Sequence, residues 1–424
     1  MFTQSALTSC DSYKLAHAEM YPPGTTKVYS NFTPRSMHHF NVIDEFKDGR
    51  VVWFGLQLFL TEMKEIWQTT FFDLPEDEVI EEFAAFVGPF CGDKGFNVNR
   101  LRELHKLGYL PLKIKALPEG VRVPVNVPVL TITNTLDPFF WLPNFMEIWL
   151  SCELWKSMTS ATTSDAYKKI LNKYVELTGS SKEFAAWQLH DFSVRGMSGI
   201  IDAGKSGAGH LLSSLGTDNL PAVKALNDVY SGKETFVGGS VPATEHSVMC
   251  AGGKESEIET FRRLIQTYPT GVLSIVSDTW DFWNVVGDDT SLAALLKDDI
   301  LNRQPDSLGL AKVVFRPDSG DPVRIIVGWD YTEVESLDDP DLPGLLTGHG
   351  GIAHAGQLAG QPGLGQFGFG ADLAQQHVGL APGVTQQGRT GLRASHQRNG
   401  HDAQGHQHFD QGEAAQAVLM SAVG

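Results

Sequence analysis

Two segments near the middle of the chain combine aromatic, basic and acidic side chains that could bind a small polar ligand. Residues 189–198 read LHDFSVRGMS, in which the Phe192 ring could stack on a flat heterocycle and the Arg195 guanidinium could bind phosphate or a carbonyl oxygen. Residues 215–219 read LGTDN, so the Asp218 carboxylate follows a glycine turn and could accept a hydrogen bond from an amide NH₂. Taken alone, each segment also fits an ordinary loop, with a surface Arg in the first and a turn or capping Asp in the second.

A histidine segment follows. Residues 239–247 read GSVPATEHS, where Glu245 adjoins His246 and Pro242 stiffens the approach. With these neighbours, His246 is a candidate for a catalytic role. The alternative is a structural histidine that only satisfies hydrogen bonds.

Acidic side chains follow two apolar runs further along. Residues 273–277 and 311–315 are short, rich in β-branched side chains, and followed by turns that contain aspartate. This is typical of parallel strands that deliver side chains to a site at their C-terminal ends. After the second run the chain reads RPDSGD, so Arg316 could pair with an anion and Asp318 could hold ribose hydroxyls or a magnesium-bound phosphate. A plain surface turn is the alternative.

A competing motif lies at residues 199–206, GIIDAGKS, which fits the G-x-x-x-x-G-K-[ST] phosphate-loop pattern. That pattern requires a buried apolar strand before it and a helix after it. The preceding residues, HDFSVRGMS, are not such a strand, and Asp202 would lie near the phosphates. An ATPase that uses Lys205 is therefore the weakest of the alternatives.

Helical and strand patterns alternate around these segments. Residues 51–60 form an apolar run that suits a buried strand or helix, and residues 122–133, RVPVNVPVLTIT, alternate as a pair of strands would. A buried helix is expected over 141–149, a helix capped by Ser164 and Asp165 and ended by Gly179, and another helix over 255–268. The pattern predicts an α/β protein with a barrel or a doubly wound sheet.

Composition excludes several classes of protein. The chain has 33 Lys and Arg against 50 Asp and Glu, a net charge of −17, which argues against a nucleic-acid or anionic-membrane binder. The four cysteines are far apart and form no CxxC or Cys/His cluster, so we expect neither a disulfide scaffold nor a zinc site. No signal sequence or long apolar run occurs, and we expect a cytosolic protein.

The composition changes after about residue 330. From 347 onward Gly, Gln and His dominate, with no strand or helix period, so residues 329–424 are expected to be a low-complexity, disordered tail. A reading-frame shift in the coding region is one hypothesis for this change. The histidines are irregularly spaced, and no metal site is predicted among them.

Taken together, these segments resemble the nicotinamide phosphoribosyltransferase family, a group of type II phosphoribosyltransferases. DSYK at 11–14, HDFSVRG, GTD, SVPATEHS, SIVSDTWD and RPDSGDP occur in the family's order, over roughly residues 5–328. The resemblance implies an α/β barrel-like domain beside a mixed α+β domain, and a homodimer with its active site at the subunit interface. It implies transfer of phosphoribosyl from 5-phosphoribosyl-1-pyrophosphate to nicotinamide, with Mg²⁺ on the substrate and ATP as a co-substrate that phosphorylates a histidine.

The resemblance also assigns the base pocket. Nicotinamide would stack between Phe192 and the partner subunit's Tyr13, and Asp218 would accept a hydrogen bond from its carboxamide NH₂. Arg195 and Arg316 would bind phosphate or the carboxamide oxygen. This arrangement would select the amide over nicotinate, whose transfer is the nearest alternative reaction.

On the phosphate side, His246 matches the histidine that is phosphorylated, and Asp318 would hold the ribose. Ser274 and Asp278 would line the base pocket or support that histidine, and Arg35 resembles a pyrophosphate contact from the partner subunit. Together with Arg316, His246 and Asp318 form the predicted catalytic group.

The predicted organisation has three parts: a mixed α+β domain over 1–150, a barrel-like catalytic domain over 151–328, and the tail over 329–424. Beyond residue 328 we find no Gly-Asp strand end, no glycine-rich phosphate loop and no later basic residues of the family kind. We therefore expect a barrel that is incomplete at its C-terminal end. A remnant that binds nicotinamide and dimerises, without catalysis, is the alternative from another functional class.

Overall fold

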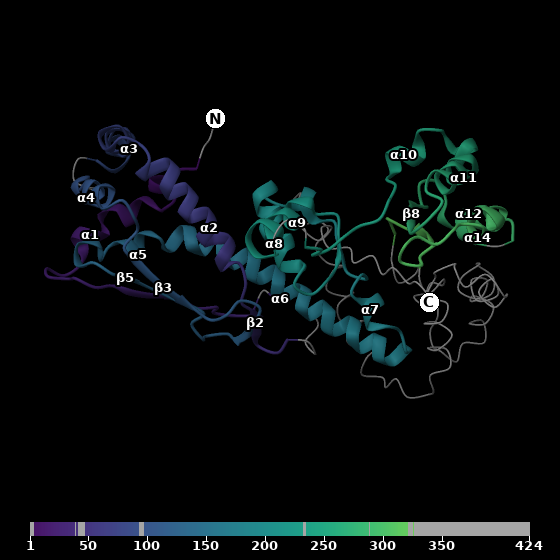
Figure 1. Ribbon diagram of the computed structural model, residues 1–424, viewed down its shortest axis with the longest axis horizontal. Helices are drawn as coiled ribbons and strands as arrows, with labels where there is room; N and C mark the ends of the chain where they lie inside the picture. Colours follow the sequence, from purple (N-terminus) through teal and green to yellow (C-terminus); the bar gives the residue numbers. More distant parts are fainter. Residues whose placement is uncertain are drawn as a thin grey trace, which may run out of the picture. The chain divides into compact units, whose positions relative to one another are not determined.

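The computed structural model describes residues 4–38, 40, 47–92, 97–231, 235–287, 289–320 and 325. The chain divides into two compact units, a first unit of Met1–Lys173 with Ala185–Gly239 and a second of Tyr174–Phe184 with the chain from Ser240 onward (Figure 1). The tail predicted over 329–424 lies outside the described residues. The sequence-based division at residues 150 and 328 stays a prediction.

An antiparallel sheet forms one side of the first unit. Its strands run in the order β1 (Tyr29–Phe32), β5 (Leu130–Asn134), β3 (Leu112–Ala116), and a separate pair joins β2 (Arg50–Val52) to β4 (Arg122–Pro124). Residues 122–133 therefore supply two strands, as predicted, but each pairs with other strands rather than with its neighbour. Strand β5 alternates buried and half-buried residues, which places one of its faces on the core.

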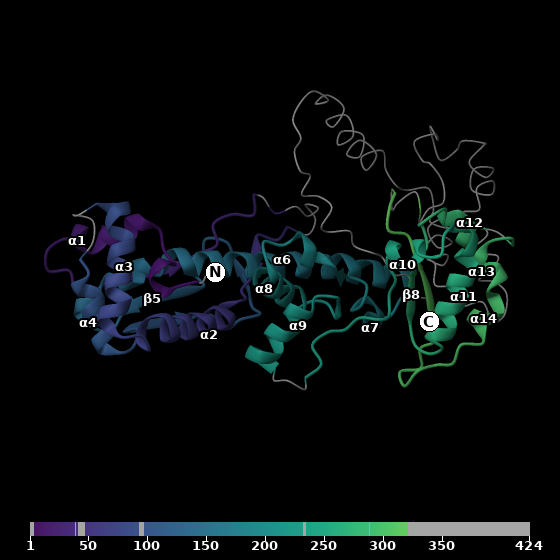
Figure 2. The same ribbon diagram turned by 90° about the horizontal axis from the view of Figure 1, so that it is seen from above.

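Helices cover the core of this unit (Figure 2). The apolar run at 51–60 contains β2 and the start of a helix, because Gly55, with φ of 106°, turns the chain between them. The long helix α6 (Glu147–Thr178) runs through Ser164 and Asp165, so the predicted cap there is wrong, although the helix does end before Gly179. The helical elements of the first unit up to α6 are η1 (Ala6–Thr8), η2 (Ser12–Ala16), α1 (His17–Met20), α2 (Leu56–Trp67), η4 (Gln68–Phe72), α3 (Glu76–Cys91), α4 (Asn99–Leu107), η5 (Asp137–Phe139) and α5 (Leu142–Phe145).

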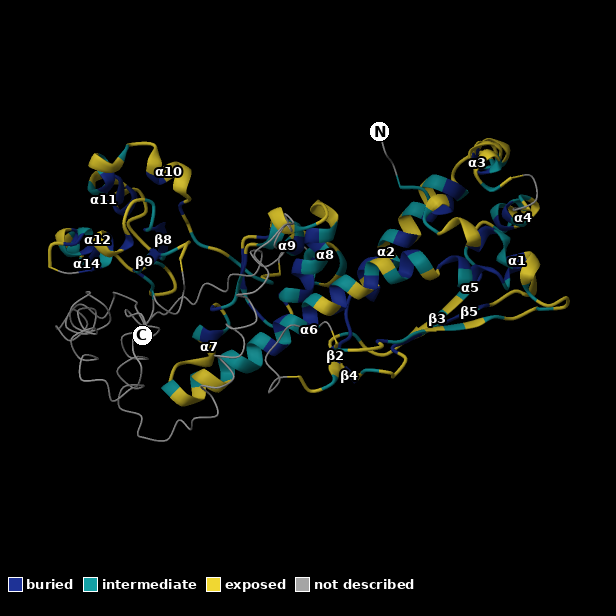
Figure 3. Cartoon of the chain, turned by 180° about the vertical axis from the view of Figure 1, so that it is seen from behind, coloured by how far each residue is buried: buried dark blue, intermediate teal, exposed yellow. Residues whose placement is uncertain are grey.

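The core beneath these helices is rich in aromatic side chains. Trp53, Phe59, Trp67 and Phe71 are almost completely buried, and Trp67 meets Phe71 edge-on at 5.4 Å between ring centroids. Figure 3 shows that α2 turns its buried residues inward and exposes the opposite side. This large apolar core provides the fixed frame on which the shorter elements of the first unit pack.

Short parallel strands follow α6 and α7 (Lys182–Ala185). Strand β6 (His190–Asp191) pairs with β7 (Gly216–Thr217), and Gly239 bridges to Gly216 in the same direction. Around them lie η6 (Ser193–Gly196), α8 (Ile200–His210), α9 (Leu220–Leu226) and η7 (Asn227–Ser231). The ends of these strands carry the HDF and GTD segments.

The second unit is built on another parallel pair, β8 (Leu273–Val276) and β9 (Val313–Arg316), as the apolar runs predicted. The predicted helix over 255–268 is α11 (Glu257–Thr267). Phe261 of α11 stacks on Phe315 of β9 at 5.9 Å in the core. The other helical elements are α10 (His246–Cys250), η8 (Lys254–Ser256), α12 (Phe282–Val286), α13 (Leu292–Leu295) and α14 (Lys297–Leu301).

The fold is therefore a mixed α/β fold, as predicted. Over the described ranges the parallel strands form two separate pairs, extended by the isolated bridges Gly216–Gly239, Ala243–Ser274 and Thr270–Gln304, rather than a closed barrel. None of the helices in these ranges is both long enough and apolar enough to cross a bilayer.

Candidate active site

The ends of β8 and β9 bring two carboxylates together. Asp278 follows β8 and Asp318 follows β9, and parallel strands end at the same edge of a sheet. The Asp278 Oδ2 atom accepts the backbone N–H of Asp318 at 2.8 Å, the N–H of Ser319 at 2.7 Å and the Ser319 hydroxyl at 2.6 Å. Asp278 thus holds the turn after β9 in place.

These hydrogen bonds also set the ionisation of Asp278. Burial of the side chain, which is 7% exposed, opposes the charged form. Hydrogen bonds from the Ser319 hydroxyl and the Asp318 and Ser319 N–H groups outweigh burial, so the pKa of Asp278 lies below its ordinary value. The group is an anion at neutral pH.

His246, the first residue of α10, faces both carboxylates. Its Nε2 lies 3.2 Å from Asp278 Oδ1 and its Nδ1 lies 3.8 Å from Asp318 Oδ2. A carboxylate can only accept, so Nε2 carries the proton toward Asp278, and in the neutral ring the lone pair lies on Nδ1. The side chain is 45% exposed and open to a ligand.

Arg316 completes this cluster from the end of β9. Its guanidinium donates to Asp318 Oδ1 at 2.7 Å and to the Thr244 carbonyl at 2.6 Å, and the residue is buried. The arginine therefore links the turn after β9 to the segment that precedes His246. The predicted catalytic group, His246, Asp318 and Arg316, lies together in the second unit.

Ser274 lies on β8 and is 1% exposed, with its hydroxyl buried and without a hydrogen-bond partner among the residues that the structure describes. Its backbone holds the segment before His246, because its N–H donates to Pro242 and its carbonyl accepts from Thr244. The Thr244 hydroxyl in turn accepts the Val276 N–H at 2.9 Å. Thr244 was not predicted, since nothing in the sequence around it reveals a partner on β8.

Phe192 and Asp218 lie at the ends of the short pair β6 and β7 in the first unit. The Asp218 N–H donates to the Asp191 carbonyl at 3.0 Å, which joins the two segments. His190 lies between them: its ring centroid is 4.6 Å from that of Phe192, and its Nε2 is 3.4 Å from Asp218 Oδ1. Phe192 is 38% exposed and the Asp218 side chain 36% exposed, so both can meet a ligand.

The remaining predicted residues lie on other elements of the first unit. Tyr13 is in η2, more than half exposed, with its ring 5.1 Å from that of His17 and 5.2 Å from the Lys14 ammonium. Arg35 lies in the segment after β1 and Arg195 in η6, and both are exposed. The structure thus groups Phe192 with Asp218, and separately His246 with Ser274, Asp278, Arg316 and Asp318.

The GIIDAGKS string is not a phosphate loop. Residues 200–206 lie inside α8, and the Asp202 carboxylate accepts the Ser198 N–H at 3.0 Å at the start of that helix. Lys205 forms ion pairs with Glu62, at 2.6 Å, and with Glu153. A lysine inside a helix and paired with two carboxylates is not arranged to cradle a phosphate, which argues against the ATPase alternative.

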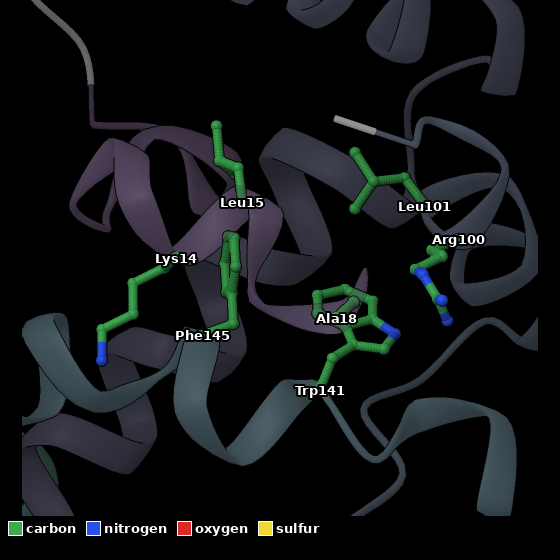
Figure 4. Close-up of a pocket in the computed structure, with 7 residues that line it drawn as sticks. All are labelled: Lys14, Leu15, Ala18, Arg100, Leu101, Trp141 and Phe145. Carbon is green, nitrogen blue, oxygen red and sulfur yellow. The ribbon is translucent and has the colours of Figure 1, made fainter. Parts of the chain in front are cut away.

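A small hollow lies elsewhere in the first unit, with room for about one water molecule. Lys14 and Arg100 lie at its two ends and Leu15, Trp141 and Phe145 between them (Figure 4). The hollow is too small for a heterocyclic base.

No group of three or more His, Cys, Asp or Glu side chains that could hold a metal ion occurs in the part of the chain that the structure describes. Asp278 and Asp318 already accept from histidine, arginine and backbone donors. In this structure these carboxylates are engaged by hydrogen bonds and ion pairs.

Comparison with known proteins identifies related sequences and structures. Residues 5–114 match the family model described as nicotinamide phosphoribosyltransferase, N-terminal domain, and residues 187–340 match that of the nicotinate phosphoribosyltransferase (NAPRTase) family. The nicotinamide phosphoribosyltransferase of Acinetobacter baylyi is 52% identical over 329 residues, 77% of this chain and 64% of that protein. The one from Mycoplasma genitalium is 30% identical over 348 residues, 77% of this chain and 69% of that protein.

Among solved structures, human nicotinic acid phosphoribosyltransferase aligns with a TM-score of 0.46 and 17% identity, over 73% of this chain and 61% of that one. The chain spans 64% of the length of the Acinetobacter relative, just under two thirds. The family-model match over residues 187–340 covers both sequence segments that supply the grouped side chains. This chain therefore belongs to the nicotinamide phosphoribosyltransferase family.

Proposed function

We propose that the chain transfers the phosphoribosyl group of 5-phosphoribosyl-1-pyrophosphate to nicotinamide, giving nicotinamide mononucleotide and pyrophosphate. The observation that carries this proposal is the cluster of His246, Asp278, Arg316 and Asp318 at the ends of two parallel strands. Membership of the family supplies the reaction, and the cluster supplies residue types that suit it.

Nicotinamide would bind at the ends of β6 and β7. The exposed face of Phe192 would stack on the pyridine ring, and the Asp218 carboxylate would accept a hydrogen bond from the carboxamide NH₂. Nicotinate would place a carboxylate against Asp218, and the two like charges repel. Arg195, exposed in η6, would contact phosphate or the carboxamide oxygen.

In the transfer step, the bond from ribose C1 to the pyrophosphate oxygen breaks and the pyridine nitrogen forms a bond to C1. The leaving pyrophosphate takes the bonding electrons, and the Mg²⁺ that it carries neutralises the added charge. Asp318 would hold the ribose hydroxyls, and Arg316 would hold Asp318 in the position to do so. Catalysis then rests on positioning and charge neutralisation, with no protein nucleophile at the sugar.

ATP would act at His246. The ring would accept the γ-phosphoryl group of ATP, and ADP would leave. Asp278 would meanwhile hold the ring through Nε2. Subsequent hydrolysis of the phosphohistidine would favour product formation. Asp278 is suited to this role because its low pKa keeps it anionic, and because its other oxygen anchors the turn that carries Asp318.

The proposal includes a homodimer, a type II phosphoribosyltransferase barrel that is incomplete at its C-terminal end, and a cytosolic location. Tyr13 and Arg35 would reach the partner subunit's site, and the exposure of both side chains supports that role. All four cysteines are free, which suits a reducing compartment.

The test is a coupled assay for nicotinamide mononucleotide with the full chain, nicotinamide, the pyrophosphate donor, Mg²⁺ and ATP. We expect product, and we expect Asp218→Asn to lose the preference for nicotinamide over nicotinate. Asp228→Asn, which removes an exposed carboxylate paired with Lys224, is the matched control and should keep the preference. Folded protein that binds nicotinamide but neither binds the donor nor makes product would instead indicate a non-catalytic, nicotinamide-binding remnant. Folded protein that binds neither substrate would refute both functions.

A further inference from the structure

A completely buried asparagine lies directly behind the two residues assigned to the nicotinamide ring. Asn219 is 0% exposed and stands between β7 and α9. We propose that Asn219 is a positioning residue that fixes Phe192 and Asp218 in the geometry that binds nicotinamide. The inference rests on the proposed function and extends it to a residue that does not touch the substrate.

The Asn219 side chain makes three hydrogen bonds, each to a different element, and uses both of its N–H donors. Its Nδ2 donates to Asp191 Oδ2 at 3.0 Å and to the Ala203 carbonyl of α8 at 2.9 Å. Its Oδ1 accepts the Ala222 N–H at 3.1 Å and thereby caps α9. One amide group thus joins the end of β6 to both helices.

Asp191 and Asn219, the two ends of one of these hydrogen bonds, each adjoin a residue assigned to the ligand. Asp191 precedes Phe192 in the chain, and its second oxygen accepts the Ser193 N–H at 2.8 Å, which fixes the backbone on both sides of Phe192. Asp218 precedes Asn219, and its own N–H donates to the Asp191 carbonyl. The stacking ring and the amide-reading carboxylate therefore share a single anchor.

The site accepts only an asparagine of this shape. Two acceptors, Asp191 and Ala203, face Nδ2, and one donor, Ala222, faces Oδ1. Aspartate would turn a second oxygen toward both acceptors, and serine is too short to span the three partners. The amide also packs directly against Gly207 of α8, where any side chain would overlap it.

The experiment measures nicotinamide binding by calorimetry to the full chain and to Asn219→Ser. We expect the Kd to rise about tenfold or more, which corresponds to about 1.4 kcal/mol. Asn134→Ser is the matched control, because Asn134 is 1% exposed, lies in the same unit, and likewise donates two hydrogen bonds, to Thr26 and Leu136, while accepting one, from Val28. The control should lower the melting temperature similarly and leave the Kd unchanged.

Exchanging the asparagine at 219 and the aspartate at 191 tests whether weaker binding comes from lost positioning or from a general loss of structure. Asn219→Asp alone places two carboxylates together and should bind nicotinamide most weakly. Adding Asp191→Asn restores a donor–acceptor pair between the two positions, though not the bond to Ala203, and should recover part of the affinity.

Two results would overturn the positioning role alone, provided that the native chain binds nicotinamide. One is an unchanged Kd in Asn219→Ser, and the other is a Kd that rises equally in the Asn134→Ser control. Failure of the exchange to recover affinity would also overturn it. Native chain that does not bind nicotinamide would overturn the proposed function and this inference together.

Discussion

Replacing Asp278 by asparagine should loosen the turn that follows β9, and the geometry gives the size of the effect. One carboxylate oxygen accepts from the Asp318 and Ser319 N–H groups and the Ser319 hydroxyl, while the other faces His246. Asparagine keeps one oxygen for these donors, but without a charge. A hydrogen bond to a charged group is worth about 1.5–3 kcal/mol, against about 0.5–1.5 kcal/mol for a neutral pair.

The loss per backbone N–H is therefore about 1 kcal/mol, which should speed hydrogen exchange at residues 318 and 319 about fivefold. Exchange followed by mass spectrometry on a peptide that spans these residues measures it directly at pH 7. Asp281→Asn is the matched control, because Asp281 caps α12 by accepting from Trp283 and Asn284, and asparagine caps a helix equally well. The control should leave exchange at 318 and 319 unchanged.

The effect should also depend on pH with a definite sign. Burial raises the pKa of Asp278, but the hydrogen bonds from Ser319 and Asp318 together lower it by more, so the pKa lies below its ordinary value. A carboxyl with a depressed folded pKa stabilises the fold above its unfolded pKa, about 3.9, and loses this contribution as the pH falls through the folded value. The difference in urea midpoint between the native chain and Asp278→Asn should thus be full at neutral pH and shrink below about pH 4. Equal exchange in the native chain and Asp278→Asn, or a midpoint difference that persists in acid, would refute this reasoning.

Two further predictions concern charged and reactive groups away from this cluster. Lys205→Met should lower the free energy of unfolding by about 2 kcal/mol, because it leaves the carboxylates on α2 and α6 without their shared cation. The same change should leave ATP turnover unaltered, and lost ATP turnover would contradict the ion-pair assignment. The more exposed Lys156→Met serves as control. Burial and the neighbouring Asp11 charge raise the pKa of the Cys10 thiol to about 12, so iodoacetamide at pH 8 should modify the exposed Cys152 and Cys250 first, and equal labelling of Cys10 by peptide mass spectrometry would show otherwise.

Much of the fold follows from patterns along the chain. The apolar runs at 273–277 and 311–315 became β8 and β9, because a short β-branched run between turns has few other places to lie. The predicted cap at Ser164 failed for a tertiary reason. The Ser164 hydroxyl donates to the His210 carbonyl and Asp165 pairs with Arg122 and Lys169, so both polar groups find partners without ending the helix.

Side chains at strand ends were predictable because strand direction alone brings them together, as with Asp278 and Asp318. Asn219 and Asp191 were not, since their bond joins positions 28 residues apart and no local pattern requires it.

Lys205 shows the opposite case, in which a sequence motif predicts a site that the fold does not form. Its motif is complete along the chain, yet in space two carboxylates hold it, whereas His246 stays 45% exposed among groups that orient it. A motif can act on a ligand only where the fold leaves its reactive atom accessible, and this condition favours the histidine segment over the lysine segment as the place where ATP would act in the proposed function.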